Sequence, residues 1–378
     1  MANVVDLRRA DDPSDLVHRA VQILAEGGIV GIPTDTTYVL AAQALRADAV
    51  AKLVGEDFAD CRKTEFGPSL AVSSAEAAED YFAGEQALVT RLARRCWPGP
   101  VTLEILADHE DSCVGRLPAA VRECLLADQR YLAIRVVGHT FVQQLHRFLP
   151  GPLVLSPLWA GGGGAITNGE AAAIQVGERV PLLLDDGPTR YGGPATVVRI
   201  KGKDYQIRYE GVVESAAIEK FSKPLLALVC TGNTCRSPMA EVLLRKRLSD
   251  LFGREDAVGV VSAGIAAYQG DQASGQAVEV MSQRGLDLTS HCSQPMTEQL
   301  LRLADVVLTM TRGHRDAILA KFPDAADRVH TLRLDGGDIA DPVGAPLEVY
   351  QQCADQIDAQ LALWIERLQG QWNSGDQQ

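Results

Sequence analysis

Apolar and polar positions follow two alternating patterns along this chain. Short apolar runs bounded by turn-forming residues predict buried strands, and apolar residues spaced three or four apart predict amphipathic helices. The two kinds of element alternate throughout, which predicts an α/β protein. The expected strands span residues 29–32, 69–72, 101–106, 131–137, 181–184, 195–200, 205–209 and 225–230. The expected helices span residues 15–26, 50–54, 85–97, 140–148, 239–248 and 349–368, and residues 33–38 and 156–164 are expected loops.

The length of the chain predicts two domains. It has 378 residues, which is enough for two hydrophobic cores of ordinary size. A short polar stretch, residues 211–224, precedes the apolar run that begins at Leu225. We therefore expect a first domain over residues 1–213, a linker over residues 214–224 and a second domain over residues 225–378.

Composition narrows the class of protein. Hydrophobic residues make up 46% of the chain and charged residues 22%, which is typical of a globular protein. The net charge of −13 argues against a broad nucleic-acid-binding surface. The N-terminus lacks the apolar core of a signal peptide, and no apolar run approaches the length of a membrane span. The eight cysteines are scattered without metal-binding spacing, so we expect a reduced, cytoplasmic protein with no metal site in the second domain.

The stretch from Leu225 onward carries the clearest chemistry. An apolar strand ends at Cys230, a polar turn containing Gly232 and Asn233 follows, and Arg236 stands at the end of this loop, just before an expected helix. Backbone N–H groups at a loop and a helix N-terminus favour a thiolate and bind phosphoryl oxygens. The Arg236 guanidinium fits two of those oxygens, and glycine and asparagine tolerate the positive φ that such a loop needs.

This pattern, Cys-x5-Arg-Ser after a strand, predicts a phosphatase loop, in which Ser237 can donate a hydrogen bond to the thiolate of Cys230. The alternative is a buried structural cysteine followed by an incidental Arg-Ser. The reaction also needs an acid for the leaving group, and Asp341, before Pro342, is the candidate. An ordinary Asp-Pro turn is the alternative at that position.

Residues from about 225 to the C-terminus resemble the low-molecular-weight protein tyrosine phosphatase family. The resemblance rests on Cys-Thr-Gly-Asn-Thr-Cys-Arg-Ser, on Ser-Ala-Gly at 262–264, on residues 304–314 and on Asp341-Pro342. It implies a four-stranded parallel sheet flanked by helices, with Cys230 as nucleophile, Arg236 as phosphate clamp and Asp341 as general acid. It also implies supporting or phosphate-binding roles for Thr231, Gly232, Asn233, Thr234, Cys235 and Ser237. His314, in the same segment, is expected to be structural.

Two positions point to a branch of that family. Thr234 stands where tyrosine-directed members usually carry an aliphatic residue, and Val343-Gly344 replace the aromatic residues that follow Asp-Pro. The loop resembles that of the bacterial protein arginine phosphatases, so phosphoarginine is favoured over phosphotyrosine as the protein substrate. For Cys235 the resemblance allows a reversible disulfide with Cys230, while a small buried side chain under the loop is the alternative.

Residues from about 10 to 213 resemble the YrdC-like threonylcarbamoyl-AMP synthases, which have a twisted open α/β sheet. The family joins threonine, bicarbonate and ATP, with magnesium, to make an intermediate for tRNA modification. The matching segments are residues 28–38, 96–102, 133–136 and 193–198. The resemblance places four residues in the cleft of this domain: Thr34, Thr37, Arg135 and Thr196.

The first domain also departs from the family pattern. Residues 39–42 lack the expected glycines, residues 61–70 lack Lys-x-Arg-Pro, and residues 156–159 lack the expected asparagine. Losing one polar contact in a site costs about 1–3 kcal/mol, so losing several makes ordinary turnover improbable. We expect a domain that binds a nucleotide, RNA or a protein without catalysis, fused to a cysteine-dependent protein phosphatase. The alternatives are an inert scaffold and an active synthase, using ATP, magnesium, threonine and tRNA, with an accessory phosphatase.

Overall fold

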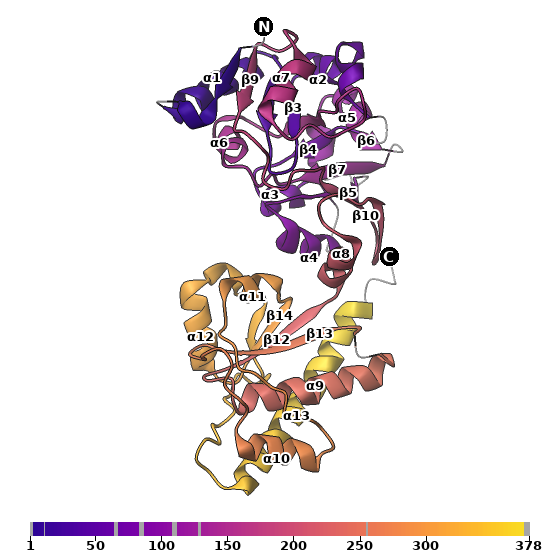
Figure 1. The fold of residues 1–378 in the computed structure, drawn as a ribbon. Helices are drawn as coiled ribbons and strands as arrows, with labels where there is room; N and C mark the ends of the chain where they lie inside the picture. Colours follow the sequence, from indigo (N-terminus) through magenta and orange to yellow (C-terminus); the bar gives the residue numbers. More distant parts are fainter. Residues whose placement is uncertain are drawn as a thin grey trace. The chain divides into compact units, whose positions relative to one another are not determined.

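A computed structural model describes residues 3–10, 12–63, 67–82, 87–107, 112–127, 130–254 and 256–373. The chain forms two compact units, Met1–Lys220 and Phe221–Gln378 (Figure 1). Each unit has its own sheet and its own helices, and each is described by itself below.

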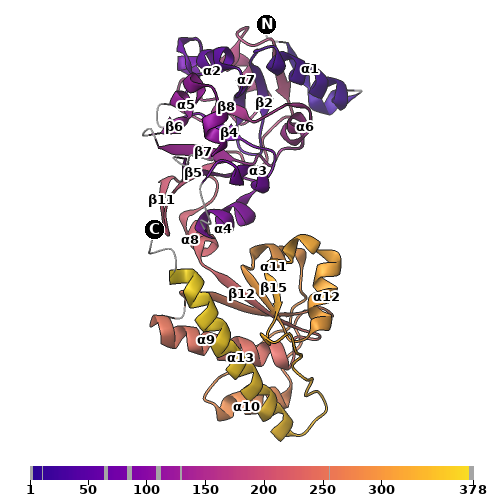
Figure 2. The same cartoon turned by 180° about the vertical axis from the view of Figure 1, so that it is seen from behind.

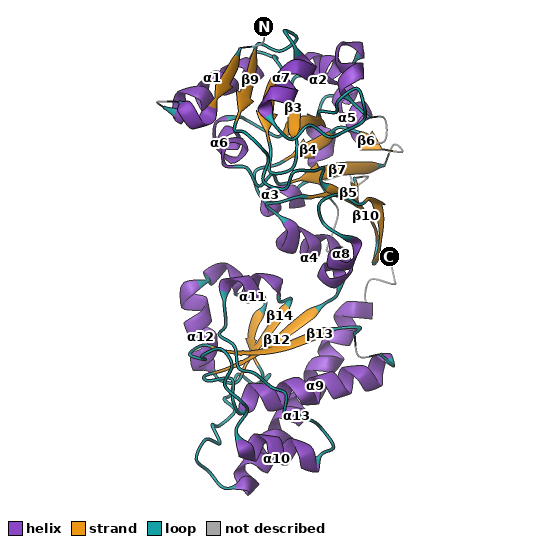
Figure 3. Ribbon diagram, viewed as in Figure 1, coloured by secondary structure: helices purple, strands orange, loops and turns teal. Residues whose placement is uncertain are grey.

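The N-terminal unit is built on one open mixed sheet, shown in orange in Figure 3. Its described strands follow the order β1-β9-β2-β3-β8-β4-β7-β5-β10-β11, and β6 pairs with β7. The strands are β1 (Val4–Asp6), β2 (Val30–Pro33), β3 (Tyr38–Gln43), β4 (Ser69–Ala71), β5 (Val101–Leu106), β6 (Leu126–Ala127), β7 (Tyr131–Arg135), β8 (Leu153–Pro157), β9 (Leu182–Asp185), β10 (Thr196–Lys201) and β11 (Asp204–Tyr209). The sheet contains both parallel pairs, such as β1 with β9 and β4 with β7, and antiparallel pairs, such as β2 with β3 and β3 with β8.

Helices pack on this sheet through apolar side chains. Helices α1 and α6 share a buried cluster with β2, to which Leu24, Ile32 and Leu145 belong. The α-helices are α1 (Pro13–Ala25), α2 (Ala47–Val54), α3 (Ala75–Glu79), α4 (Ala87–Cys96), α5 (Ala119–Leu125), α6 (Thr140–Phe148), α7 (Gly169–Val176) and α8 (Ser215–Ser222). The 3₁₀ turns are η1 (Leu7–Arg9), η2 (Glu56–Cys61) and η3 (Cys113–Arg116).

The C-terminal unit has a smaller, fully parallel sheet. Its order is β13-β12-β14-β15, with β12 (Leu225–Cys230), β13 (Gly259–Gly264), β14 (Val306–Thr309) and β15 (Val329–Thr331). The helices are α9 (Arg236–Phe252), α10 (Gly275–Gln283), α11 (Glu298–Leu303), α12 (Arg312–Lys321) and α13 (Leu347–Asn373), with the turn η4 (Pro323–Ala325). This confirms the predicted four-stranded parallel sheet flanked by helices.

Side-chain alternation along β12 explains the layers of this unit. Leu226 and Leu228 point into a core shared with α9, α10 and α13, whereas Ala227 and Val229 point into a core shared with α11 and α12. Both views show the two helix groups on opposite faces of the sheet (Figure 1, Figure 2). A strand that is buried on both faces lacks polar alternation, which is why 225–230 is a continuous apolar run.

The two loops expected from the sequence, residues 33–38 and 156–164, were each predicted with a wrong boundary. Residues 33–38 were expected to be a loop, but Tyr38 begins β3, a strand whose residues are all buried. In the segment Tyr-Val-Leu-Ala-Ala-Gln, apolar and polar residues do not alternate, and two of the residues are alanine. Its hydrophobic pattern therefore did not predict a strand. Ser156 and Pro157, expected in the glycine-rich loop, extend β8 and pair with β3.

Candidate active site

The loop between β12 and α9 places a thiol among hydrogen-bond donors. Cys230, the last residue of β12, is only 3% exposed. Its sulfur lies 3.3 Å from the backbone nitrogen of Asn233, which donates to it, and 3.0 Å from the Ser237 hydroxyl oxygen. The Asn233 N–H donates to this sulfur, and the Ser237 hydroxyl, which is also 3.3 Å from the Ala263 carbonyl, can donate to it when the thiolate forms.

Asn233 shapes this loop. It has φ +56°, the one positive φ outside glycine among the described residues. Its side-chain amide donates to Ser237 at 3.0 Å and to Ser262 at 2.9 Å, and its carbonyl lies 2.7 Å from the His291 ring nitrogen. Asn233 is fully buried, and these hydrogen bonds hold its side chain and its backbone in place. They therefore restrict the conformation of the loop.

The neighbouring strand approaches the loop closely at Gly264. A Cβ atom on Gly264 would lie 2.4 Å from the Thr231 carbonyl oxygen and 3.0 Å from the Asn233 nitrogen. Any side chain at this position would therefore push the loop away from β13. The Ser-Ala-Gly segment thus serves the geometry of the loop.

Arg236 and Asp341 meet at the other end of the loop. Arg236 is 4% exposed, donates to the Ile339 carbonyl at 3.0 Å and forms an ion pair with the Asp341 carboxylate. The Asp341 side chain is 46% exposed, so solvent reaches this carboxylate. The structure thereby brings together the predicted clamp and the predicted acid, which lie 105 residues apart in sequence.

Thr234 and Cys235, the last two loop residues before Arg236, have contacts of their own. The Cys235 sulfur lies 3.3 Å from the Ser274 hydroxyl and 3.6 Å from the Tyr350 hydroxyl, beneath the loop. Thr234 is half-buried, and its hydroxyl lies 3.7 Å from the Cys235 sulfur. Both Cys230 and Cys235 are free thiols in this structure, and their reversible disulfide stays a prediction.

In the N-terminal unit, the predicted cleft residues gather at the turn between β2 and β3. The Thr34 hydroxyl donates to the Thr37 carbonyl at 2.6 Å and accepts from the Thr37 N–H at 3.1 Å. Arg135 donates to Thr36 at 3.1 Å and to the Asp35 carboxylate at 2.8 Å. Three of the four predicted residues thus lie near one another: Thr34 and Thr37 are bonded to each other, and Arg135 of β7 is bonded to Asp35 and Thr36 between them.

The fourth predicted residue, Thr196, bonds to the segment that follows β11 and not to the Thr34–Thr37 turn. Its hydroxyl donates to the Val213 carbonyl at 2.7 Å and accepts from the N–H groups of Gly211 and Val213, each at 3.0 Å. These bonds tie the segment after β11 back to β10. The hydroxyl therefore has a structural use in this fold.

Two of the altered family motifs contact each other. Trp159, in the segment that lacks the expected asparagine, is 4% exposed, and its backbone N–H donates to the Cys61 carbonyl at 2.9 Å. The Lys63 ammonium lies 4.3 Å from the centre of a Trp159 ring. The lysine ammonium over the indole face is a cation–π contact that joins these two segments.

Comparison with known proteins identifies both units. A family model described as "Low molecular weight phosphotyrosine protein phosphatase" matches residues 225–374, and one described as "Telomere recombination" (Sua5_yciO_yrdC) matches residues 22–211. A protein-arginine-phosphatase of Geobacillus stearothermophilus is 41% identical over 148 residues, which cover 38% of this chain and 95% of that protein. The chain belongs to both families.

Further relatives carry related names. A protein-arginine-phosphatase of Bacillus subtilis is 39% identical over 38% of this chain and 95% of its own length. A probable low molecular weight protein-tyrosine-phosphatase, EpsP, of Ralstonia nicotianae is 35% identical over 38% of this chain and 94% of its own length. Both predicted resemblances, and the assignment of the second half to a protein phosphatase family, are confirmed.

Several residues around the low-molecular-weight phosphatase loop were missed or undervalued by sequence reasoning. Tyr268, four residues after the end of β13, is 81% exposed, and the preceding Ala266 N–H donates to the Thr231 carbonyl at 3.0 Å. His291 and His314 bond to the loop from two other segments. An aromatic residue close behind Ser-Ala-Gly was the available signal for Tyr268, whereas nothing local marks the histidines.

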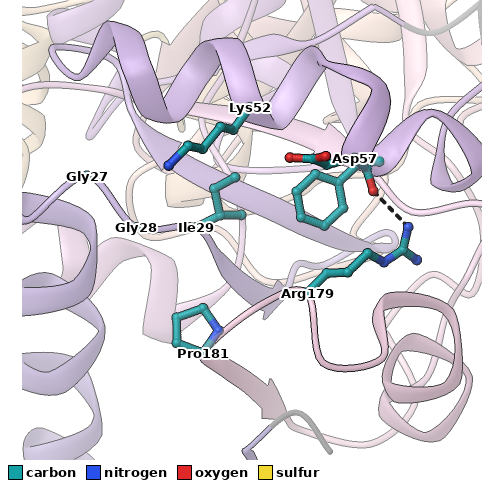
Figure 4. A pocket seen from close by; sticks show the side chains of 8 residues that line it. Gly27, Gly28, Ile29, Lys52, Asp57, Arg179 and Pro181 are labelled. Atoms are coloured by element: carbon teal, nitrogen blue, oxygen red, sulfur yellow. Dashed lines mark hydrogen bonds between the residues drawn. The ribbon is translucent and has the colours of Figure 1, made fainter.

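A pocket of about 390 Å³ lies at the opposite end of β2 from the Thr34–Thr37 turn. Phe58 lines this pocket, and Figure 4 shows Ile29, Lys52 and Arg179 around it. Arg179 is already bonded to the Asp57 carbonyl at 2.8 Å and to the Asp60 carboxylate at 2.6 Å. These bonds hold η2 against the end of α7, so the pocket's arginine is used to fix structure.

Searches for two other kinds of feature gave negative results within the described ranges. No group of three or more His, Cys, Asp or Glu side chains there could hold a metal ion. Among the helices of those same ranges, none combines the length and apolar character that a bilayer span requires.

Proposed function

We propose that the C-terminal unit is a cysteine-dependent protein phosphatase that works through a phosphocysteine intermediate and prefers phosphoarginine. The observation that carries this proposal is the convergence on the Cys230 sulfur of the Asn233 N–H and the Ser237 hydroxyl, with Arg236 at the end of the same loop. The family assignment supports the reaction class, and relatives named protein-arginine-phosphatases support the substrate.

In the first step the Cys230 thiolate attacks phosphorus. A sulfur–phosphorus bond forms, the bond from phosphorus to the leaving nitrogen or oxygen breaks, and the electron pair leaves with that atom. Protonated Asp341 gives its proton to the leaving group. Arg236 and the loop amides bind the phosphoryl oxygens, so phosphate must displace the Asp341 carboxylate from Arg236.

In the second step water attacks the phosphocysteine. Asp341 takes a proton from this water, the sulfur–phosphorus bond breaks and orthophosphate leaves. The Ser237 hydroxyl, 3.0 Å from sulfur, stabilises the departing thiolate. The proposal requires no metal or cofactor, because Arg236 and backbone N–H groups supply the positive potential. It places the enzyme in the cytoplasm, where a thiol nucleophile stays reduced.

The substrate preference rests on what surrounds the loop. A phenyl ring is best held between aromatic walls, but Val343, which follows Asp341-Pro342, is an aliphatic residue with 66% of its surface exposed. A hydroxyl at Thr234 can bond the guanidinium of phosphoarginine or orient the attacking water. Phosphotyrosine is the second candidate, because exposed Tyr268 offers one aromatic surface beside the loop.

Parallel kinetics decide between these substrates. We expect wild-type kcat/KM to be higher on a phosphoarginine protein than on a phosphotyrosine peptide, and Thr234→Ile to shift the ratio toward phosphotyrosine by about tenfold. Thr234→Ser is the matched control, since it keeps the hydroxyl. A wild-type enzyme that prefers phosphotyrosine would contradict the substrate proposal and leave the phosphatase proposal intact.

For the N-terminal unit we propose binding of a nucleotide or RNA without synthase turnover. The absence of turnover is supported by three contacts that already occupy polar groups of this unit. They are the Arg135–Asp35 pair, the bonds of Thr34 within its turn and the Lys63–Trp159 contact. The alternative is a threonylcarbamoyl-AMP synthase, for which ATP and magnesium would be required in this unit. It is favoured by membership of the family alone.

A single assay separates these two proposals. With ATP, magnesium, threonine and bicarbonate, we expect no pyrophosphate release above a control that lacks threonine. Melting temperatures with ATP or with tRNA then measure binding. Threonine-dependent pyrophosphate release would establish the synthase and overturn the binding proposal.

A further inference from the structure

The first turn of α12 lies between the two loops that carry the proposed nucleophile and acid. His314, in this turn, has its ring Nε2 2.9 Å from the hydroxyl oxygen of Thr231, the residue after Cys230. Two positions earlier, the Arg312 N–H donates to the Asp338 carboxylate at 2.8 Å, in the segment that leads to Asp341. One helical turn thus contacts both loops through separate side-chain bonds.

His314 is buried and neutral in this position. Its residue surface is 6% exposed, and its backbone N–H donates to the capping Thr311 hydroxyl at 3.2 Å. Burial, followed by the positive charge of Arg236, lowers the pKa of His314 from its ordinary value. The nearby carboxylates of Asp341 and Asp338 act in the opposite direction but do not outweigh burial. The positive end of the α12 dipole also disfavours an imidazolium here.

The hydrogen-bonding pattern selects the tautomer. The other ring nitrogen of His314, Nδ1, is buried and has no partner among the described residues. An orphaned buried N–H is rarer than an orphaned acceptor, so the proton belongs on Nε2. The Nε2–H then donates to the Thr231 oxygen, and the Thr231 hydroxyl proton is left to point elsewhere.

The position of Thr231 allows it to donate its hydroxyl proton to a ligand of the loop. Its side chain is exposed beside the nucleophile, while its backbone carbonyl is fixed by the Ala266 N–H at 3.0 Å. The His314 N–H occupies one lone pair of the hydroxyl oxygen, so the hydroxyl hydrogen takes another position around the Cβ–Oγ bond and can be donated to a ligand. A preorganised donor at the mouth of an anion-binding loop favours a phosphoryl oxygen.

We propose that His314 is a positioning residue that orients the Thr231 hydroxyl as an additional hydrogen-bond donor to the phosphoryl group of the substrate. The inference rests on the proposed phosphatase function. It changes the sequence expectation for His314, which was structural only.

Paired substitutions test the proposal. We expect Thr231→Val to lower kcat/KM on an aryl phosphate about tenfold and to weaken competitive inhibition by orthophosphate, while Thr231→Ser restores both. His314→Leu should match Thr231→Val, and His314→Gln, whose amide can reach the same oxygen, should retain most activity. The Thr231→Val/His314→Leu double variant should lose no more than either single one, because both remove one donor.

Controls keep the outcome interpretable. His330→Leu, in β15 beside Trp364, removes another partly buried histidine of the same unit and should leave kcat/KM unchanged. Melting temperatures identify any variant that fails to fold, and Thr231→Val, at an exposed position, tests the idea without touching the core. Wild-type kcat/KM in His314→Leu, or additive losses in the double variant, would overturn the proposal.

A measurement that does not need turnover separates this inference from the proposed function. Histidine side-chain ¹⁵N spectra should show His314 as the Nε2–H tautomer, with a signal that shifts in Thr231→Val and on adding orthophosphate to the wild type. An Nδ1–H tautomer would overturn the positioning role even in an active enzyme. An enzyme with this tautomer and phosphate response but no turnover on any phosphoprotein would instead contradict the proposed function.

Discussion

The two units each place polar residues after a buried strand, but they use them differently. In the C-terminal unit, the Asn233 N–H and the Ser237 hydroxyl converge on the Cys230 sulfur, at the start of a loop that we propose to bind an anion. In the N-terminal unit, the turn after β2 bonds to itself, because the Thr34 hydroxyl donates to the Thr37 carbonyl and accepts from the Thr37 N–H. Polar groups that bond to each other, as in the Thr34 turn, stabilise the fold. Polar groups that surround one side chain, as around Cys230, can instead stabilise its reactive form.

Their arginine–aspartate pairs show the same contrast. In the Arg135–Asp35 pair both side chains are buried, with 6% and 1% of their surfaces exposed. In the Arg236–Asp341 pair the arginine is buried but the carboxylate is 46% exposed. An exposed carboxylate can be exchanged for a phosphate, while a fully enclosed one leaves an uncompensated charge when removed.

Loss of the nucleophile is expected to have the largest effect. Cys230→Ser should lower hydrolysis of an aryl phosphate by roughly 10⁴-fold or more, since a serine hydroxyl is a poor nucleophile in a site built for a thiolate. The steady-state rate with a fluorogenic aryl phosphate measures it. Substantial turnover by this variant would contradict the phosphocysteine mechanism.

Removing the charge of the acid should separate chemistry from binding. Asp341→Asn is expected to lower kcat by about 10²- to 10⁴-fold, because the leaving group lacks its proton. Orthophosphate should bind about fivefold more tightly, because the carboxylate no longer competes for Arg236. Inhibition constants for orthophosphate measure this, and weaker binding would show that the open pair does not gate the site.

In the N-terminal unit, breaking the enclosed pair should affect stability and spare phosphatase catalysis. Asp35→Ala is expected to destabilise this unit by about 3–5 kcal/mol, since Arg135 would stay buried without its partner. Hydrogen exchange in β2 and β7 of the full chain measures it. The matched control is Asp60→Ala, whose pair with Arg179 is partly exposed and should cost under about 1 kcal/mol.

The smallest expected effect is a pH dependence of the same unit. Burial lowers the pKa of His146 to about 4 from an ordinary value near 6.5. Below pH 6.5 the unfolded chain binds a proton that the folded unit refuses, so stability falls as pH decreases from 6.5 toward 4, by about 3 kcal/mol.

His146→Leu should remove that part of the pH dependence of unfolding, measured by urea denaturation at pH 7 and pH 4.5. His18→Leu, at an exposed position of α1, is the control. If the difference in unfolding free energy between pH 7 and pH 4.5 is the same in His146→Leu as in the wild type, this histidine is not buried in its neutral form.

Several elements were predictable because their signals are local. The strand over Val101–Leu106 and the helix over Thr140–Phe148 match their expected bounds, since apolar periodicity and adjacent turns define both. The strand over Tyr38–Gln43 was missed, because it directly follows a hydroxyl-rich turn and its two alanines give a weak strand signal. The predicted site residues of the loop are contiguous in sequence, so a single stretch sufficed to propose them.

The sequence by itself determined which groups stand at the end of β12: a thiol, a turn that accepts positive φ, an arginine and a serine. Spacing along one loop fixes these, because neighbours in sequence cannot separate. Tertiary structure alone decided that Asp341 meets Arg236, that His314 reaches Thr231 across 83 residues, and that Arg135 is enclosed by Asp35. Those contacts depend on how strands and helices pack, and packing is set by the whole buried surface and not by any local pattern.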